Sequence, residues 1–161
     1  KRQISHHSLL YDDMTARENL VFYGMLFGVD GPGERADELL RLVDLHRRKD
    51  SRVSQFSRGM KQRLSIARAL VNDPSLLLLD EPFSGLDRYA ASMLSEKLEE
   101  LRNRKRTVIL VTHNLGLGLK PASKVGVLAA GELVLLEERD SLDPEKFEER
   151  YLHLIQGAQV A

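Results

Sequence analysis

Apolar positions in the first half of the chain follow a helical spacing. The segment 15–27 opens with the capping-box pair Thr15 and Glu18 and runs without a break to Gly28, which predicts one helix. A turn at 31–33 and an amphipathic helix over 35–43 are expected next. Ser57 is a suitable N-cap for a third helix, which should end near the Asn-Asp-Pro sequence at 72–74.

Beyond residue 75 the pattern changes to short, continuous apolar runs. The four leucines at 76–79 and the β-branched run at 107–111 predict strands buried on both faces of a parallel sheet. A long helix is expected between them over 89–104. Strand, helix and strand in succession favour an α/β fold with a parallel core.

The last fifty residues have a different pattern. Two apolar segments, 124–128 and 132–136, flank Ala130-Gly131 and predict a β-hairpin. A surface helix is expected over 145–155. These elements extend the predicted α/β fold without adding a repeat.

Composition narrows the class of protein. The chain has 161 residues, enough for one ordinary domain, and 42% of them are hydrophobic. The absence of cysteine excludes a disulfide scaffold, a thiol nucleophile and a cysteine-bound zinc. The apolar runs are too short to span a bilayer, and the first residues have no signal-peptide core. A cytosolic protein is therefore expected.

The formal net charge of zero conceals an uneven distribution. Residues 46–63 contain seven basic side chains and one acidic side chain, whereas residues 132–150 contain eight acidic and three basic side chains. The basic stretch could bind nucleic acid. However, Phe56 is its only aromatic residue, and phosphates of a nucleotide or a solvated helix face explain the charge equally well. Nucleic acid is therefore not expected as a partner.

Asp80 and Glu81 directly follow the leucine run. Carboxylates at this position lie at the carboxyl edge of a sheet, where ligand sites of α/β proteins form. Asp80 can hold a hydrated Mg²⁺ that bridges phosphate oxygens, and Glu81 can activate a water as general base. The plain alternative is a strand that ends in solvated acids.

Three further motifs are individually weak. Ser57-Arg58-Gly59-Met60 could expose backbone N–H groups to an anion at a helix start, but it could equally be an ordinary cap. His113 follows a strand and could contact a phosphate, although a lone histidine is more often structural. Ser84-Gly85-Leu86-Asp87 forms a tight turn behind the acid pair, and could simply begin a helix.

Together, the order and spacing of these motifs resemble the nucleotide-binding domain of ABC transporters. In that family they correspond to the signature motif (57–63), Walker B with its glutamate (76–82), the D-loop (84–87) and the switch histidine (112–113). The resemblance implies a P-loop NTPase-like, partial parallel sheet with flanking helices and a helical subdomain. The implied segments are a Q-loop region (1–14), the helical subdomain (15–72), part of the catalytic core (73–130) and a C-terminal hairpin strand and helix (131–161).

The resemblance also implies an activity, which is ATP hydrolysis coupled to transport. Two such subunits would face each other head to tail, dock on integral membrane permease subunits and lie on the inner face of the cell membrane. Glu81 and His113 would be catalytic, and Asp80 would serve Mg²⁺ through water. The implied nucleotide-binding residues are Ser57, Arg58, Gly59, Met60, His6 and Asp87.

Departures from the family pattern suggest a subgroup. His6 occupies the position of the Q-loop glutamine, Arg58 that of a common glycine, and Met60 that of a glutamine. Together with the sequence 11–20, these departures resemble the haem-exporter ATPases of cytochrome c biogenesis, and ABC-2 type exporters for other solutes share much of the pattern. A metal site at His6 and His7 lacks convincing carboxylate partners.

The family's phosphate-binding loop, with its Gly-Lys dipeptide, has no counterpart among the 11 glycines of the chain. In the family this loop lies upstream of the Q-loop. We therefore expect that N-terminal strands are missing, that the 161 residues alone bind MgATP poorly, and that apolar sheet edges are exposed. The alternative is a non-catalytic half-site module that offers only its signature face to another subunit's ATP.

Overall fold

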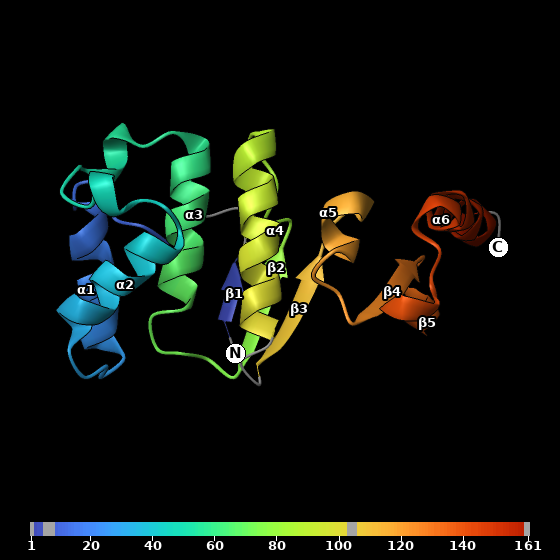
Figure 1. Cartoon of the computed structure of the whole chain (residues 1–161), viewed down its shortest axis with the longest axis horizontal. Coiled ribbons are helices and arrows are strands. Elements are labelled where there is room, and N and C mark those ends of the chain that lie inside the picture. The colour runs from blue at the N-terminus through green and yellow to red at the C-terminus, as the bar shows by residue number, and fades with distance from the viewer. Residues whose placement is uncertain (1, 5–8, 103–105, 160–161) are drawn as a thin grey trace. The chain divides into compact units, whose positions relative to one another are not determined.

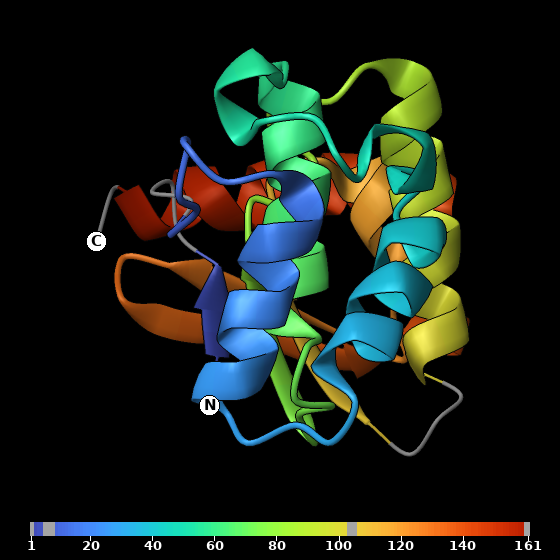
Figure 2. The same cartoon turned by 90° about the vertical axis from the view of Figure 1, so that its left-hand side faces the viewer.

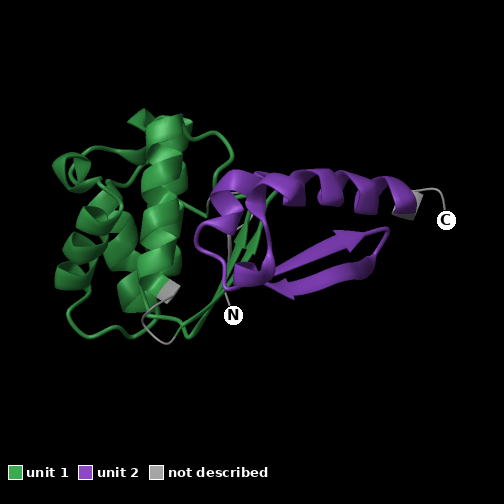
Figure 3. Ribbon diagram, turned by 45° about the vertical axis from the view of Figure 1, so that its right-hand side comes forward, with its two compact units in different colours: residues 1–112 green, residues 113–161 purple. Residues whose placement is uncertain are grey.

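The computed structural model describes residues 2–4, 9–102 and 106–159, which divide into two compact units, 1–112 and 113–161 (Figure 3). The first unit contains β1 (Arg2–Ile4), α1 (Ala16–Leu26), α2 (Pro32–Leu42), α3 (Arg58–Ala69), β2 (Leu76–Asp80), α4 (Arg88–Arg102) and β3 (Thr107–Val111). Single 3₁₀ turns lie at His46–Arg48 and Val53–Gln55. The second unit contains α5 (Leu115–Leu119), β4 (Lys124–Ala129), β5 (Glu132–Glu138), a 3₁₀ turn at Arg139–Ser141 and α6 (Pro144–Gln159).

The predicted capping box begins α1. The hydroxyl of Thr15 accepts a hydrogen bond from the backbone N–H of Glu18 (3.1 Å), and the Glu18 carboxylate accepts one from the backbone N–H of Thr15 (2.7 Å). These hydrogen bonds lower the pKa of Glu18 below its ordinary value and outweigh the opposing desolvation. Ser57 caps α3 as expected. The expected turn at 31–33 is wrong in part, because α2 already begins at Pro32, whose fixed φ suits the first helical position.

The sheet of the first unit is fully parallel, in the order β1-β2-β3. Leu79 of β2 pairs with Ile4 on one side and with Leu110 on the other. Figures 1 and 2 show α3 and α4 on one face of this sheet, with α1 and α2 packed outside them. The α/β fold with a partial parallel sheet and flanking helices is therefore confirmed.

The prediction that both strands are buried on both faces is wrong. In β2, Leu77 and Leu79 are buried, but Leu76 and Leu78 are only half-buried. In β3, Ile109 is 50% exposed and Val111 is 52% exposed. Within this unit the helices cover one face, so side chains that alternate along a strand divide between a covered and an open face. The exposed apolar side chains of β3 lie on this open face, whereas the sequence analysis expected exposure at the edges of the sheet.

The second unit confirms the predicted hairpin, with β4 antiparallel to β5. Ala130 and Gly131 form its turn, and both have a positive φ. The hairpin's inner face, α5 and α6 share a small core of Leu119, Val127, Leu135, Leu142 and Phe147. The short α5, which the sequence pattern did not predict, is capped by Asn114. Among the residues that the structure describes, no helix is both long and apolar enough to cross a bilayer.

Candidate functional site

The direction of the chain brings the start of α3 and the end of β2 together. The 12 residues of α3 rise about 18 Å, and the 5 residues of β2 return over about 17 Å in the opposite direction. The matched lengths place Ser57, where α3 begins, near the carboxyl edge of the sheet, where Asp80 ends β2. Two motifs that are more than twenty residues apart in sequence therefore meet.

The acid turn, defined as residues 80–87, connects β2 to α4. Glu81 has a φ of +46°, in the left-handed region that residues other than glycine rarely adopt. Its backbone N–H donates to the carbonyl of Val111 (2.8 Å), and its carboxylate accepts a hydrogen bond from the Thr112 hydroxyl (3.3 Å). β3 and the residue after it therefore fix both the backbone and the carboxylate of the predicted catalytic glutamate.

Thr112 lies within the predicted switch motif (112–113), but the sequence analysis gave it no role of its own. It stands between β3 and the predicted switch histidine, and its hydroxyl contacts Glu81. The sequence did contain a signal for this role, namely a hydroxyl-bearing residue directly after β3. Because β3 is parallel to β2, both strands end at the same edge of the sheet.

Asp80 is half-buried at the last position of β2. The described residues contain no group of three or more His, Asp or Glu side chains that could hold a metal ion by themselves. A single carboxylate nevertheless fits Mg²⁺ that arrives with a nucleotide, because this ion keeps several waters and takes its other ligands from phosphates. Asp80 is therefore a suitable ligand for nucleotide-borne Mg²⁺, with no dedicated protein cage around it.

At the start of α3, Ser57 and Arg58 are exposed, and Gly59 and Met60 are half-buried. The Ser57 hydroxyl accepts a hydrogen bond from the backbone N–H of Met60 (3.2 Å), as an N-cap does. Arg58 donates to the hydroxyl of Ser84 (3.3 Å). One turn further along α3, Gln62 donates to the carbonyl of Pro82 (3.2 Å), so two side chains tie this helix to the acid turn.

Asp87 has a structural contact within its own chain. Its carboxylate accepts a hydrogen bond from the backbone N–H of Ala90 (2.8 Å) in the first turn of α4. The side chain therefore stabilises the start of this helix.

The two predicted histidines occupy different parts of the chain. His113 is exposed and is the first residue of the second unit, directly after Thr112, where the chain leaves β3. Because β2 and β3 are parallel, the chain leaves β3 at the edge where β2 ends. His6 lies outside the described residues, and so does His7.

The segment after His6 is attached to the helices. Asn19 is fully buried, accepts a hydrogen bond from the backbone N–H of Tyr11 (2.8 Å) and donates to the carbonyl of Tyr11 (2.9 Å). Lys61, on α3, forms an ion pair with Asp12 (2.7 Å). The predicted Q-loop region is thus linked to the same helix that begins with Ser57.

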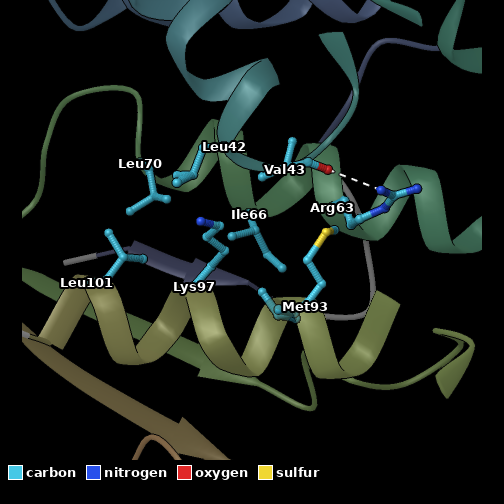
Figure 4. A pocket seen from close by; sticks show the side chains of 9 residues that line it. Leu42, Val43, Arg63, Ile66, Leu70, Met93, Lys97 and Leu101 are labelled. Carbon is cyan, nitrogen blue, oxygen red and sulfur yellow. Dashed lines mark hydrogen bonds between the residues drawn. The ribbon is translucent and has the colours of Figure 1, made fainter. Parts of the chain in front are cut away.

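A cavity of about 20 Å³ lies among α2, α3 and α4, and is large enough for one water at most (Figure 4). Apolar side chains, including Leu42, Ile66 and Leu101, line it. Arg63 reaches across its rim and donates to the carbonyl of Val43 (3.2 Å). None of the predicted site residues lines this cavity, so the candidate site is the open edge formed by the acid turn and the start of α3.

Comparison with known proteins identifies relatives that match between 63% and 84% of this chain. Proteins named Nod factor export ATP-binding protein I are 38–47% identical to this chain over the aligned residues. The protein from Paraburkholderia xenovorans is 47% identical over 103 residues, which are 63% of this chain and 34% of that protein. The protein from Bradyrhizobium diazoefficiens is 38% identical over 138 residues, which are 84% of this chain and 45% of that protein. The alignments thus span less than half of these relatives.

A solved structure shows the same fold. The dimeric, post-hydrolysis state of the ATP-binding cassette MJ0796, bound to ADP and Pi, superposes with a TM-score of 0.76 and 26% sequence identity. The match covers 87% of this chain and 63% of that chain. The family model described as ABC transporter matches residues 2–84, a little over half of the chain, and includes the start of α3 and the acid pair. The chain therefore belongs to the ABC transporter family.

Proposed function

We propose that the chain forms part of the ATP-hydrolysing subunit of an ABC exporter. The observation that supports this most is the meeting of the acid turn and the exposed start of α3 at one edge of the sheet. An acid pair, a hydroxyl partner and exposed helix N–H groups are the elements required to position phosphates and water.

Glu81 acts as general base toward the attacking water. The hydrogen bond from Thr112 orients its carboxylate, and the bond from its N–H to Val111 fixes its backbone. Asp80 would hold Mg²⁺ through water, and the bound ion would supply positive charge to offset that of the phosphates. His113 contacts the terminal phosphate, and His6 takes the place of the family's glutamine. Catalysis is then positioning and electrostatic stabilisation, as in other phosphoryl transfers.

A second ATP-binding subunit completes the site in a head-to-tail dimer. Ser57, Arg58, Gly59 and Met60 lie at the exposed start of α3, where they can reach a nucleotide held by the partner. Asp87 faces the same partner, in addition to its contact with α4. Integral membrane permease subunits dock on the helices of 15–72, so that the protein works at the cytoplasmic face of the membrane. No nucleic acid is involved.

For the transported solute, the comparisons favour the ABC-2 type alternative over haem export. The relatives reported above are named for Nod factor export, and none of their names refers to haem or to cytochrome c. We therefore set haem export aside and propose export of another solute.

Replacing Glu81 tests the general-base role. In the whole natural protein that carries this chain, Glu81→Gln should retain ATP binding but lower the rate of ATP hydrolysis by about 100-fold or more, because a general base contributes on that order. Glu148→Gln, an exposed position in α6, is the matched control and should hydrolyse ATP like the wild type. Undiminished phosphate release from Glu81→Gln would exclude the general-base role.

The exposed start of α3 supports a second candidate, a half-site module that offers only this signature face to another subunit's ATP. Such a module would raise the ATP hydrolysis of a complete subunit on mixing, through the start of α3, even when its own Glu81 is replaced by Gln. If the chain instead hydrolyses ATP alone, or binds it with micromolar affinity in isothermal titration, the half-site proposal fails.

A further inference from the structure

The Arg58 side chain lies directly on the acid turn. Besides donating to the Ser84 hydroxyl, it covers Gly85 so closely that a Cβ built at Gly85 would lie 2.6 Å from Arg58 Nε and 2.8 Å from Arg58 Cδ. Gly85 also has a φ of +74°. Glycine at this position therefore satisfies two requirements at once, the backbone conformation of the turn and the space that Arg58 occupies.

The turn transmits this contact to the predicted general base. The backbone N–H of Ser84, whose hydroxyl accepts from Arg58, donates to the carbonyl of Glu81 (3.1 Å). The backbone N–H of Glu81 in turn donates to Val111 (2.8 Å). A continuous path of hydrogen bonds thus runs from α3 through Ser84 and Glu81 to β3.

We propose that Arg58 is a positioning residue: it holds the Ser84-Gly85 turn in place, and through that turn it fixes Glu81 for the attack of water. The proposal rests on the proposed function for its catalytic consequence. It gives Arg58 a task within its own chain, separate from contact with a partner's nucleotide. Because the same residue begins α3, any displacement of that helix start is passed to the acid turn.

A second side chain of α3, that of Gln62, also holds the acid turn. Gln62 donates to the carbonyl of Pro82, one residue beyond Glu81, and stays in place when Arg58 is replaced. Loss of Arg58 should therefore loosen the turn at Ser84 and Gly85 while the fold is retained.

Kinetics of the whole natural protein test the catalytic part. Arg58→Gln and Ser84→Ala should each lower kcat for ATP hydrolysis about fivefold, the factor that corresponds to one ordinary hydrogen bond, and leave KM nearly unchanged. The double variant should be no slower than either single variant, because both remove the same contact. Arg58→Lys should recover part of kcat, since an ammonium can still donate to Ser84.

Arg47→Gln is the matched control. It removes the same charge from an exposed position of the basic stretch, away from the acid turn, and should leave both kinetic constants unchanged. If the losses of Arg58→Gln and Ser84→Ala multiply, or if Arg58→Gln raises KM alone, Arg58 acts on the nucleotide and not through Ser84, and the proposal is wrong.

Hydrogen exchange without nucleotide tests the structural part independently of any ATPase activity. The Ser84 amide should exchange several-fold faster in Arg58→Gln and in Ser84→Ala than in the wild type or Arg47→Gln. Unchanged exchange at Ser84 would overturn the proposal even if the protein hydrolyses ATP. If the wild type hydrolyses no ATP but the variants show the expected faster exchange, the proposed function is contradicted. The contact between Arg58 and the acid turn is then still supported.

Discussion

Two turns of the molecule contain residues with a positive φ, in very different surroundings. In the acid turn, Glu81 has a φ of +46° and Gly85 has a φ of +74°; in the hairpin turn, Ala130 has a φ of +49° and Gly131 has a φ of +85°. Each therefore places one ordinary residue and one glycine in the left-handed region. The difference lies in what holds the ordinary residue there.

The hairpin turn needs nothing beyond its own strands. A two-residue connection between antiparallel strands favours positive φ at both positions, because this matches the twist of the strands. Ala130 and Gly131 are exposed, and a Cβ at Gly131 would meet no atom within 4 Å. Local geometry accounts for the conformation of this turn.

The acid turn depends on its neighbours. Side chains from α3 and the carbonyl of Val111 in β3 hold it from two sides. Backbone strain that tertiary contacts maintain is characteristic of functional sites. In the hairpin turn, the positive φ values result from joining two strands. In the acid turn, they are held by neighbouring elements and position the carboxylate of Glu81.

The two glycines give the largest expected difference between the turns. Gly85→Ala should lower the free energy of unfolding by about 2 kcal/mol and Gly131→Ala by about 1 kcal/mol, because both alanines are strained by their φ but only Gly85 is also covered by Arg58. Urea unfolding followed by circular dichroism measures both. In an Arg58→Ala background the two losses should become equal, and a persisting difference would show that Arg58 is not its source.

Replacing the strained ordinary residues by glycine should have a smaller and opposite effect. Ala130→Gly should raise the free energy of unfolding by about 1 kcal/mol, since it removes the steric penalty of the left-handed region. Glu81→Gly should gain about half as much, because it gives up the hydrogen bond from Thr112, and it should abolish ATP hydrolysis in the whole protein. The same unfolding measurement checks both variants. Equal gains would indicate that the bond from Thr112 adds no stability.

The smallest expected effect concerns an ion pair that joins the hairpin to α6. Glu137, on β5, accepts hydrogen bonds from Arg150, on α6, at 2.6 Å and 3.0 Å. This hydrogen bonding lowers the pKa of Glu137 and outweighs the opposing desolvation. A folded-state pKa below the unfolded one stabilises the protein at pH values above the unfolded pKa. This stability is lost as the pH falls through the folded value.

Wild type and Glu137→Gln should therefore differ most at pH values above the unfolded pKa of Glu137 and converge as the pH falls below its lowered folded pKa, where the carboxyl is protonated in both states. Urea midpoints measured along a pH series give the comparison, with Glu148→Gln as the control for the loss of an exposed charge from the same unit. A difference that stays constant down to the lowest pH would show that the ionised pair is not its cause.

Local patterns predicted most of the elements. Thr15 and Glu18 fixed the start of α1, Ser57 fixed the start of α3, and Ala130-Gly131 fixed the hairpin turn, because a cap or a two-residue turn is made by residues close in sequence. The errors came where the surroundings decide. The leucine run indicated a strand, but it could not show that α3 and α4 cover only one of its faces.

For the candidate site too, the sequence predicted some features and not others. Adjacent acids after an apolar strand, a serine and glycine at a helix start, and a histidine after the next strand were visible in the sequence, as was the family that they resemble. The departures at Arg58 and Met60 pointed toward haem exporters, and the relatives do not support that assignment. Few residues of an ATP-binding subunit contact the solute, so solute specificity leaves little trace in its sequence.

The sequence by itself determined the caps of α1 and α3, the hairpin turn, and which side chains could serve a nucleotide, because these properties depend on neighbours along the chain. Only the tertiary structure placed Arg58 against Ser84 and Gly85, and Thr112 against Glu81. Those contacts join residues 26 to 31 positions apart, and they exist because α3 and β2 run in opposite directions while β2 and β3 run in parallel. Spacing in a sequence does not specify such distances until the chain has folded back on itself.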